Sequence, residues 1–236
     1  MIAPEWPGSH PFVVFLHGGG QNRGAFLNEA LLLAVAGVAS LLIDLPQARA
    51  FPDFLQPEKD QAVLEQTVLS VTHGMDCLAI RSDIDLRRGA IIGFSFGAWI
   101  GSVVAASDVR IRGAVLTSGV PRMSEFWRAS LHPDVIRIRD RFSSNVMDRY
   151  VNLLKPSDAI EHLRLCSQVC LFFQFGSEDE LISQASVNEF LPYGRGDNRL
   201  KIYDAASHYQ MFFNLDARKD RVSWIHDRFE VRERRR

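Results

Sequence analysis

The chain has 236 residues with 27 basic and 28 acidic side chains, so its formal net charge at neutral pH is −1. This length fits one domain with a large apolar core. The near balance of charges gives no indication of a nucleic-acid partner or of an anionic membrane surface. The longest apolar run, 30–43, is interrupted by Gly37 and Ser40 and is too short to span a bilayer. A soluble protein is therefore expected.

The cysteines and the first residues of the chain give indications of the cellular compartment. Cys77, Cys166 and Cys170 form neither an even set for disulfides nor a zinc-binding spacing. Cys166 and Cys170 flank and enter an apolar segment, so we expect buried free thiols, which are typical of a reducing compartment. Residues 1–11 contain prolines and lack the apolar segment of a secretory signal. These features predict a cytoplasmic location.

Short apolar segments alternate with longer helical patterns along the chain. The expected strands are 12–16, 38–43, 89–92, 113–117, 169–175 and 200–203, and the main expected helices are 58–81, 98–106, 181–191 and 211–229. Such alternation predicts right-handed β–α–β crossovers and a mostly parallel sheet covered by helices on both faces. The predicted fold class is therefore α/β, with residues 1–236 forming one domain.

Residues 121–165 interrupt this alternation, because they are far more numerous than one crossover helix needs. The segment is rich in charged and aromatic residues. It is either an irregular surface excursion or a helical cap over the strand ends, and the cap is favoured because sites are built from long insertions at that edge. Phe126 and Trp127 follow closely on the strand that ends at Thr117, so we expect them to bind the substrate.

The sequence Gly-Phe-Ser-Phe-Gly at 93–97 joins a short buried strand directly to a helix-forming segment. Gly-x-Ser-x-Gly at such a turn is typical of a nucleophile elbow. Its glycines remove β-carbons that would clash in so tight a turn. Ser95 would then lie at a helix N-terminus, where developing negative charge is stabilised. The alternative is a glycine-rich turn with an ordinary serine.

A serine nucleophile needs backbone donors for the oxyanion, and a glycine-rich loop can supply them. His17-Gly18-Gly19-Gly20 directly follows the first expected strand. We expect the amide of Phe96 and one from Gly19 or Gly20 to form the oxyanion hole, although a plain glycine turn is the alternative. His17 is expected to be a structural loop histidine.

The serine also needs a base and an acid, which parallel-sheet geometry places in loops after strands. Asp179 follows the strand ending at Phe175 and is the expected acid, with Glu178 as the alternative; Asp179 could also simply cap a helix. His208 follows the last expected strand and is the expected base. The other histidine downstream of Asp179, His226, falls inside the predicted terminal helix.

Ser95, Asp179 and His208 follow the chain order Ser–acid–His of the α/β-hydrolases, and the sequence resembles that superfamily over essentially its whole length. The run 81–88 leading into the 93–97 motif resembles the dienelactone-hydrolase and prolyl-oligopeptidase-like branches. Two features depart from them: the first strand begins near Phe12, leaving no room for the two N-terminal strands of larger members, and Ser95 stands where dienelactone hydrolases typically have cysteine.

The resemblance implies an N-terminally shortened α/β-hydrolase fold and hydrolysis of esters, thioesters, lactones or peptides without a cofactor. The predicted function is a carboxylesterase-like serine hydrolase that acts on a small-molecule ester or acyl substrate through an acyl-enzyme on Ser95. No metal, nucleic-acid or membrane partner is expected, and a homodimer is compatible with the sequence. Two alternatives stay open: an acyltransferase that uses the same three residues, and a binding protein that keeps the fold without activity.

Overall fold

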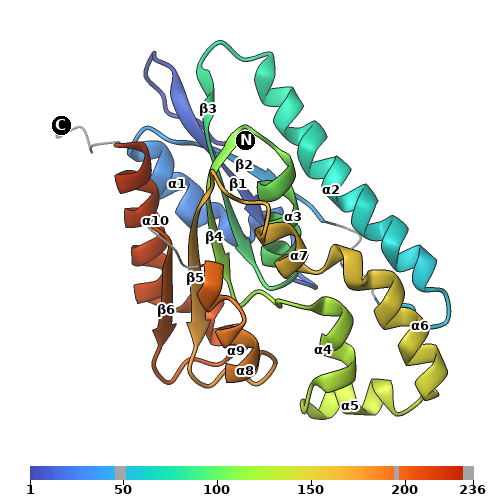
Figure 1. Ribbon diagram of the computed structural model, residues 1–236. Coiled ribbons are helices and arrows are strands. Elements are labelled where there is room, and N and C mark those ends of the chain that lie inside the picture. Colours follow the sequence, from blue (N-terminus) through green and yellow to red (C-terminus); the bar gives the residue numbers. More distant parts are fainter. Residues whose placement is uncertain (46–51, 194–196, 231–236) are drawn as a thin grey trace.

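The computed structural model describes residues 1–45, 52–193 and 197–230, and within these ranges six strands form one parallel sheet (Figure 1). The strands are β1 (His10–Leu16), β2 (Ala39–Ile43), β3 (Ile84–Phe94), β4 (Ile111–Thr117), β5 (Cys170–Gly176) and β6 (Arg199–Tyr203). They lie in the order β2-β1-β3-β4-β5-β6. The predicted α/β fold with a parallel sheet is therefore confirmed.

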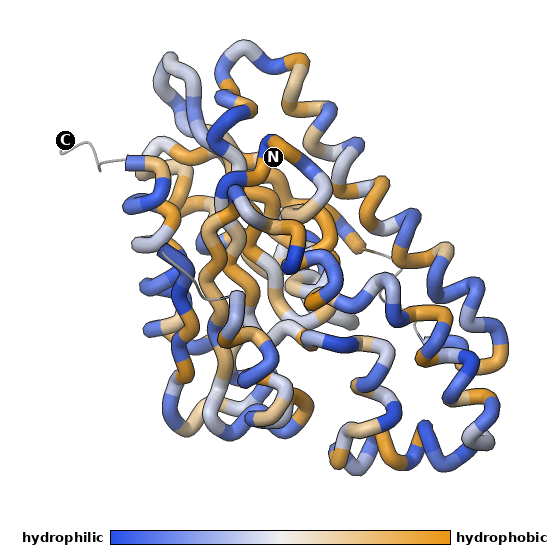
Figure 2. Tube along the Cα trace, viewed as in Figure 1, coloured by the Kyte–Doolittle hydropathy of each residue, from blue (hydrophilic) through white to orange (hydrophobic). Residues whose placement is uncertain are grey.

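Each face of the sheet carries its own apolar core because successive strand residues point to opposite faces. In β1, Phe12, Val14 and Leu16 contribute to one core, whereas Val13 and Phe15 contribute to the other. Helices α2 (Pro57–Ala79) and α3 (Phe96–Ser107) cover the first core, and α1 (Leu27–Val35) and α10 (Leu215–Phe229) cover the second. Figure 2 shows the apolar residues concentrated in the central strands.

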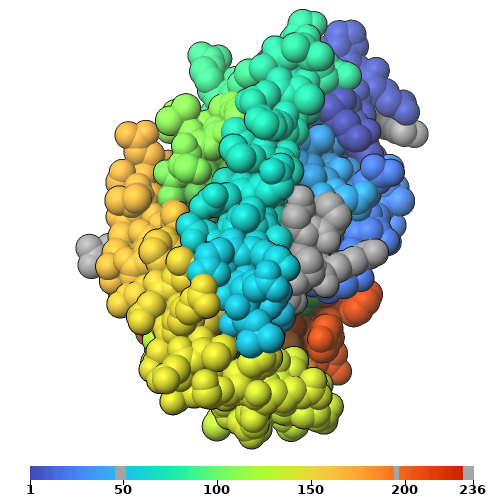
Figure 3. Space-filling model, turned by 90° about the vertical axis from the view of Figure 1, so that its right-hand side faces the viewer, coloured from blue at the N-terminus to red at the C-terminus, as the bar shows by residue number. Residues whose placement is uncertain are grey.

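Residues 121–165 are helical rather than irregular. They form α4 (Met123–Ala129), α5 (Pro133–Arg139), α6 (Ser144–Leu154), a 3-10 turn (Lys155–Ser157) and α7 (Ala159–Leu163). Helices α4 and α5 extend past the end of the sheet at which the strands finish, and α6 packs against α2 (Figures 1 and 3). The segment is therefore helical, and its role as a cap over the site stays a prediction.

A buried carboxylate ties two parts of the 121–165 segment together. Asp158 is fully buried, and its two carboxylate oxygens accept hydrogen bonds from the backbone N–H of Ser124 at 2.9 Å and from the Ser124 hydroxyl at 2.6 Å. Ser124 lies in the first turn of α4, so Asp158 caps that helix from outside. Burial raises the pKa of Asp158 from its ordinary value of 3.8 to about 6.

This raised pKa gives a pH-dependent contribution to stability. Between pH 4 and pH 6 the folded chain retains a proton on Asp158 that the unfolded chain has lost, so this contribution is present at acid pH and is lost as pH rises through about 6. In Asp158→Asn, one acceptor oxygen remains and the titration disappears. The quantity to compare is the free energy of unfolding of the wild type minus that of Asp158→Asn. We expect this difference to fall by about 2 to 3 kcal/mol as the pH rises from 4 to 7. Urea unfolding across this range measures it; a pH-independent difference contradicts the assignment.

The C-terminal helix differs from the sequence prediction of one helix over 211–229. It is divided into α9 (His208–Phe213) and α10, and Asn214 separates them. The Asn214 side-chain oxygen accepts hydrogen bonds from the N–H groups of Asp216 and Ala217, which is the action of an N-cap. α9 begins at His208, with Ser207 as its N-cap, so His208 lies at the start of a short helix and not in a loop.

Other local differences follow from charge and capping. β3 begins at Ile84, whereas the sequence predicted a start at residue 89. The prediction missed the first half of the strand because charged residues there hide the apolar strand pattern. The expected 181–191 helix is reduced to α8 (Gln184–Asn188) and a 3-10 turn (Leu191–Tyr193). The sequence did not single out α1, which follows a 3-10 turn (Arg23–Phe26).

The thiols of Cys166 and Cys170 are free but only half-buried, whereas the sequence predicted buried thiols. No helix among the described residues is long and apolar enough to cross a membrane.

Candidate active site

Ser95 lies in the turn between β3 and α3, in a conformation that residues with a side chain seldom adopt. Its φ is 52° and its ψ is −114°. The Ser95 N–H donates to the Thr117 carbonyl at 2.9 Å, and the Ser95 carbonyl accepts from the N–H groups of Ala98 and Trp99 at 3.0 and 3.1 Å. Hydrogen bonds to β4 and to α3 thus hold the turn from both sides.

The glycines of the 93–97 motif are required sterically. A β-carbon on Gly97 would lie 2.0 Å from the Leu16 carbonyl oxygen, and one on Gly93 would lie 2.4 Å from the Gly97 carbonyl oxygen. These neighbours are backbone atoms, so no side-chain rotation could relieve the clash. Both glycines of the motif are therefore required by the close approach of neighbouring backbone.

His208 connects Ser95 to Asp179 through hydrogen bonds. Its Nε2 lies 2.9 Å from the Ser95 Oγ, and its Nδ1 lies 2.9 and 3.1 Å from the two carboxylate oxygens of Asp179. The side chains of His208 and Asp179 are only 3% and 1% exposed. The structure therefore brings the three residues predicted from the sequence together in one hydrogen-bonded chain, in which Ser95 is half-buried.

The direction of the hydrogen bonds follows from the acceptor character of the carboxylate. An ionised carboxylate only accepts hydrogen bonds. Nδ1 of His208 therefore carries the ring proton and donates a hydrogen bond to Asp179. Nε2 is then left as an acceptor for the Ser95 hydroxyl. This is the tautomer in which an imidazole can take a proton from serine.

Asp179 acts both as a turn cap and as the partner of the imidazole. Its Oδ1 accepts from the N–H groups of Leu181 and Ile182 at 3.0 and 2.8 Å, which fixes the carboxylate in place. The capping alternative raised by the sequence is thus true at the same time as the contact with His208. Glu178, the alternative acid, is exposed.

A residue that the sequence did not single out also holds His208. The Glu180 carboxylate accepts from the backbone N–H of His208 at 3.0 Å, and Ser207 and Gln210 form a capping box around the start of α9. The Phe94 ring lies 5.4 Å from the imidazole, centre to centre. The signal available in the sequence was the acidic run 178–180, from which only one residue was assigned to the imidazole.

The glycine loop after β1 lies beside the Ser95 turn, because β1 and β3 are neighbours in the sheet and Leu16 pairs with Gly93. Gly19 and Gly20 are exposed, and a β-carbon on either would meet only open space. Phe96 is the first residue of α3, where backbone N–H groups point out of the helix end. The predicted donors thus lie at the ends of two adjacent strands.

His17 is structural, as the sequence suggested. It is buried; its Nε2 accepts from the Leu45 N–H at 2.8 Å, and its Nδ1 donates to the Gly18 carbonyl at 2.8 Å. Both ring nitrogens are occupied in holding the loop. His226, the other histidine downstream of Asp179, lies half-buried on α10.

Comparison with known proteins decides the family. A model of the alpha/beta hydrolase family matches residues 13–223, which is most of the chain. The chain belongs to the alpha/beta hydrolase family. No curated protein matches it. The resemblance drawn from the Ser–acid–His order is thereby confirmed at the level of the family.

Solved structures of hydrolases and esterases share the fold at low sequence identity. Acetyl xylan esterase 1 from Thermoanaerobacterium has a TM-score of 0.73 at 16% identity, over 96% of this chain and 77% of that one. A protein assigned as a dienelactone hydrolase from Klebsiella pneumoniae has a TM-score of 0.65 at 18% identity, over 97% and 90%. A 2,6-dihydroxy-pseudo-oxynicotine hydrolase has a TM-score of 0.67 at 19% identity; the match covers 95% of this chain but only 62% of that one.

In this alpha/beta hydrolase a cavity of about 550 Å³ lies between α4 and the loop that carries Asp179. Its apolar wall includes Phe126, Ala129, Leu131, Leu181 and Ile182, and its charged rim includes Arg122, Glu125, Glu180 and Glu189. Phe126 thus lines the cavity, whereas Trp127 is not among its lining residues. The Trp127 ring packs edge-on against Phe54 and Phe126, with centres 5.5 and 5.1 Å apart.

Proposed function

We propose that this alpha/beta hydrolase is a carboxylesterase-like serine hydrolase that cleaves carboxylic esters, or related thioester, lactone or peptide bonds, through an acyl-enzyme on Ser95. The observation that carries the proposal is the hydrogen-bonded chain from the Ser95 Oγ through His208 to Asp179. Membership of the family supports hydrolase chemistry. The strained turn supports Ser95 as the nucleophile, because strain of this kind gathers at functional sites.

In the proposed reaction, His208 Nε2 takes the Ser95 proton while Oγ forms a bond to the substrate carbonyl carbon. The carbonyl oxygen becomes an oxyanion, which the backbone N–H of Phe96 and one from Gly19 or Gly20 stabilise. The imidazolium then gives its proton to the leaving group as the bond to that group breaks, and the acyl group stays on Ser95. Water, deprotonated by His208, releases the acid and restores the serine.

The surroundings of His208 favour this proton transfer. The imidazolium that forms lies against the Asp179 carboxylate in a buried position, where the attraction between opposite charges is stronger than in water. Asp179 is held by two backbone N–H groups, so it need not reorganise when the charge develops. The pair is therefore preorganised for the transition state.

The cavity beside Asp179 is the proposed site for the acyl or leaving group. Its volume lies within the range of small-molecule pockets, and Phe126 forms part of its apolar wall. Burial of such a ring against substrate contributes about 1 to 3 kcal/mol. Trp127 is proposed to support this wall, because its ring contacts both Phe126 and Phe54.

Phe126→Ala is expected to change kcat/KM unevenly across p-nitrophenyl esters of increasing acyl length. The loss should reach roughly 5- to 100-fold for a long acyl chain and be small for acetate, because only a long chain reaches the ring. Trp127→Ala should show a weaker form of the same unevenness together with a lowered melting temperature. An equal loss on every ester for Phe126→Ala would contradict the placement of substrate in this cavity.

The proposed function is tested with p-nitrophenyl esters of graded chain length beside a chromogenic peptide. We expect release of p-nitrophenol by the wild type and its absence with Ser95→Ala, and Ser102→Ala serves as a matched control on α3. Product analysis with added alcohol separates the hydrolase from the acyltransferase. Predominant transfer to the alcohol at low alcohol concentration would favour the acyltransferase, and failure to turn over any ester, thioester, lactone or peptide would contradict an enzyme of this class.

A further inference from the structure

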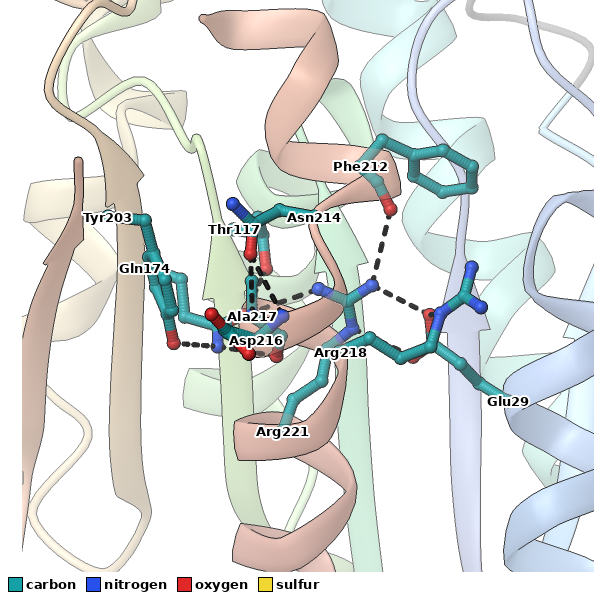
Figure 4. A network of polar contacts seen from close by, with 10 residues as sticks. All are labelled: Glu29, Thr117, Gln174, Tyr203, Phe212, Asn214, Asp216, Ala217, Arg218 and Arg221. Carbon is teal, nitrogen blue, oxygen red and sulfur yellow. Dashed lines mark hydrogen bonds and ion pairs between the residues drawn. The ribbon is translucent and has the colours of Figure 1, made fainter. Parts of the chain in front are cut away.

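A buried polar network lies within the core between the sheet and the C-terminal helices, and Gln174 on β5 is its centre (Figure 4). The fully buried Gln174 amide oxygen accepts from the Thr117 hydroxyl at 2.9 Å. Its amide nitrogen donates to the Tyr203 hydroxyl oxygen at 2.7 Å and to the Ala217 carbonyl at 2.9 Å. One side chain thus ties together β4, β6 and the first turn of α10.

An ion pair between Arg221 and Glu29 extends the network to α1 and α9. Arg221 donates to both Glu29 carboxylate oxygens, at 2.6 and 2.7 Å, and the two side chains are 1% and 2% exposed. The same guanidinium lies 3.5 Å from the Phe212 carbonyl and 3.5 Å from the Gln174 amide oxygen. Figure 4 shows Arg221 between these partners.

Both ends of the network reach residues of the candidate active site. Thr117, which donates its hydroxyl to Gln174, accepts the Ser95 N–H through its carbonyl at 2.9 Å. Phe212, whose carbonyl faces Arg221, lies on the short helix α9 that begins at His208. The network therefore connects the nucleophile turn on one side with the helix of the base on the other.

Stability alone is a weak explanation for these side chains. Removing a guanidinium, a carboxylate and an amide from water is costly, and buried ion pairs can often be replaced by apolar residues without loss of stability. What a fully bonded polar network does provide is one fixed arrangement of the elements that it joins. Here the elements that it joins carry Ser95 and His208.

We propose that Gln174 and Arg221 are positioning residues that fix the distance between the Ser95 Oγ and His208 Nε2; this rests on the proposed function. Gln174 holds Thr117, and through it the Ser95 turn, against β5 and α10. Arg221 holds α9 in register with the same strand. The Oγ–Nε2 distance of 2.9 Å depends on both, and proton transfer is lost steeply when reacting groups are displaced.

A pair of substitutions at Thr117 tests the link with little change of shape. Thr117→Val removes the hydroxyl that donates a hydrogen bond to the Gln174 amide oxygen, whereas Thr117→Ser keeps that hydroxyl. Thr67→Val is the matched control, because Thr67 is also fully buried and its hydroxyl donates to the Val63 carbonyl within α2 at 2.7 Å. We expect Thr117→Val to lower kcat about 10-fold with KM changed less than about twofold. Thr117→Ser should recover most of that loss, and Thr67→Val should leave kcat unchanged.

Apolar replacement of both partners tests the ion pair without leaving either Glu29 or Arg221 as a buried unpaired charge. Arg218, whose Nε also lies 3.4 Å from Glu29 Oε1, loses that partner but is 25% exposed. Glu29→Met combined with Arg221→Met should fold with a melting temperature near that of the wild type. We expect its kcat, and its rate of labelling by a fluorophosphonate, to fall by a common factor of about 10 or more. Gln174→Met should lower kcat and the labelling rate in the same way, with a lowered melting temperature as well, because the buried Thr117 hydroxyl and Ala217 carbonyl lose a partner. A loss of melting temperature with wild-type kcat per folded molecule in all of these variants would overturn the proposal and leave the network a purely structural role.

A spectroscopic measurement separates failure of this inference from failure of the proposed function. The wild-type protein alone decides the function, through ester turnover and labelling of Ser95. The low-field proton resonance of the His208 Nδ1–H, which bridges to Asp179, needs no substrate. It should shift or broaden in Thr117→Val and in Gln174→Met but not in Thr67→Val. An unchanged resonance in all three variants counts against positioning even if the wild type proves to be an esterase.

Discussion

Ser95→Ala is expected to lower kcat for ester hydrolysis by ~10³-fold or more while the fold is retained. The serine hydroxyl is the atom that would carry the acyl group, and it lies 2.9 Å from His208 Nε2, the proposed base. The Ser95 backbone conformation has a φ of 52°, and alanine has the same β-carbon, so the turn itself need not change. Steady-state kinetics and circular dichroism of both proteins measure the two parts of this prediction.

Ser102→Ala is the control for that substitution. Ser102 lies on the same helix, buried, and its hydroxyl donates to the Ala98 carbonyl, so it should retain near wild-type kcat. A Ser95→Ala protein that hydrolyses esters within ten-fold of the wild-type rate would show that another group is the nucleophile.

His208→Ala is expected to cause a loss of similar size, because without the imidazole nothing accepts the serine proton. Asp179→Asn should cost roughly ten- to hundred-fold less, because the carboxylate orients the base and stabilises its charge but does not transfer the proton. Glu178→Gln, one residue away and exposed, is the matched control and should remain near wild type. Kinetics of the three variants on one short-chain ester give the ranking; a mild Asp179→Asn beside a damaging Glu178→Gln would assign the acid to Glu178.

The sequence predicted the architecture well because the strands are short, apolar and separated by clear helical patterns. The part of β3 that it missed carries Arg87 and Arg88, whose charge hides the strand from a hydrophobic pattern. The break at Asn214 was missed for a different reason. An N-cap inside a long amphipathic pattern changes the path of the chain without changing the periodicity around it.

The three residues of the candidate site could be predicted because their positions follow from chain order and strand ends. Glu180 could not, because its contact is with the backbone of His208, and no residue pattern marks such a bond. The separate surroundings of Phe126 and Trp127 were also beyond the sequence. They are neighbours in the chain, and only the packing of the 121–165 segment places one on the cavity and the other against Phe54.

The polar network shows the limit of pattern reading most clearly. Gln174 interrupts an apolar strand by a single residue, and Glu29 and Arg221 are 192 positions apart. In the sequence, Glu29 and Arg221 cannot be distinguished from ordinary polar residues on the surface of a helix. Their partnership exists only because α1 and α10 lie on the same face of the sheet.

The central claim is that Ser95 is a nucleophile activated by His208, and covalent labelling tests it most directly. The protein is treated with a fluorophosphonate, digested, and the adduct is located by mass spectrometry. We expect one adduct, on Ser95, that is absent from Ser95→Ala and forms far more slowly in His208→Ala. An adduct on Ser102, Ser118 or Ser207, or no adduct on a folded wild-type protein, would contradict the claim.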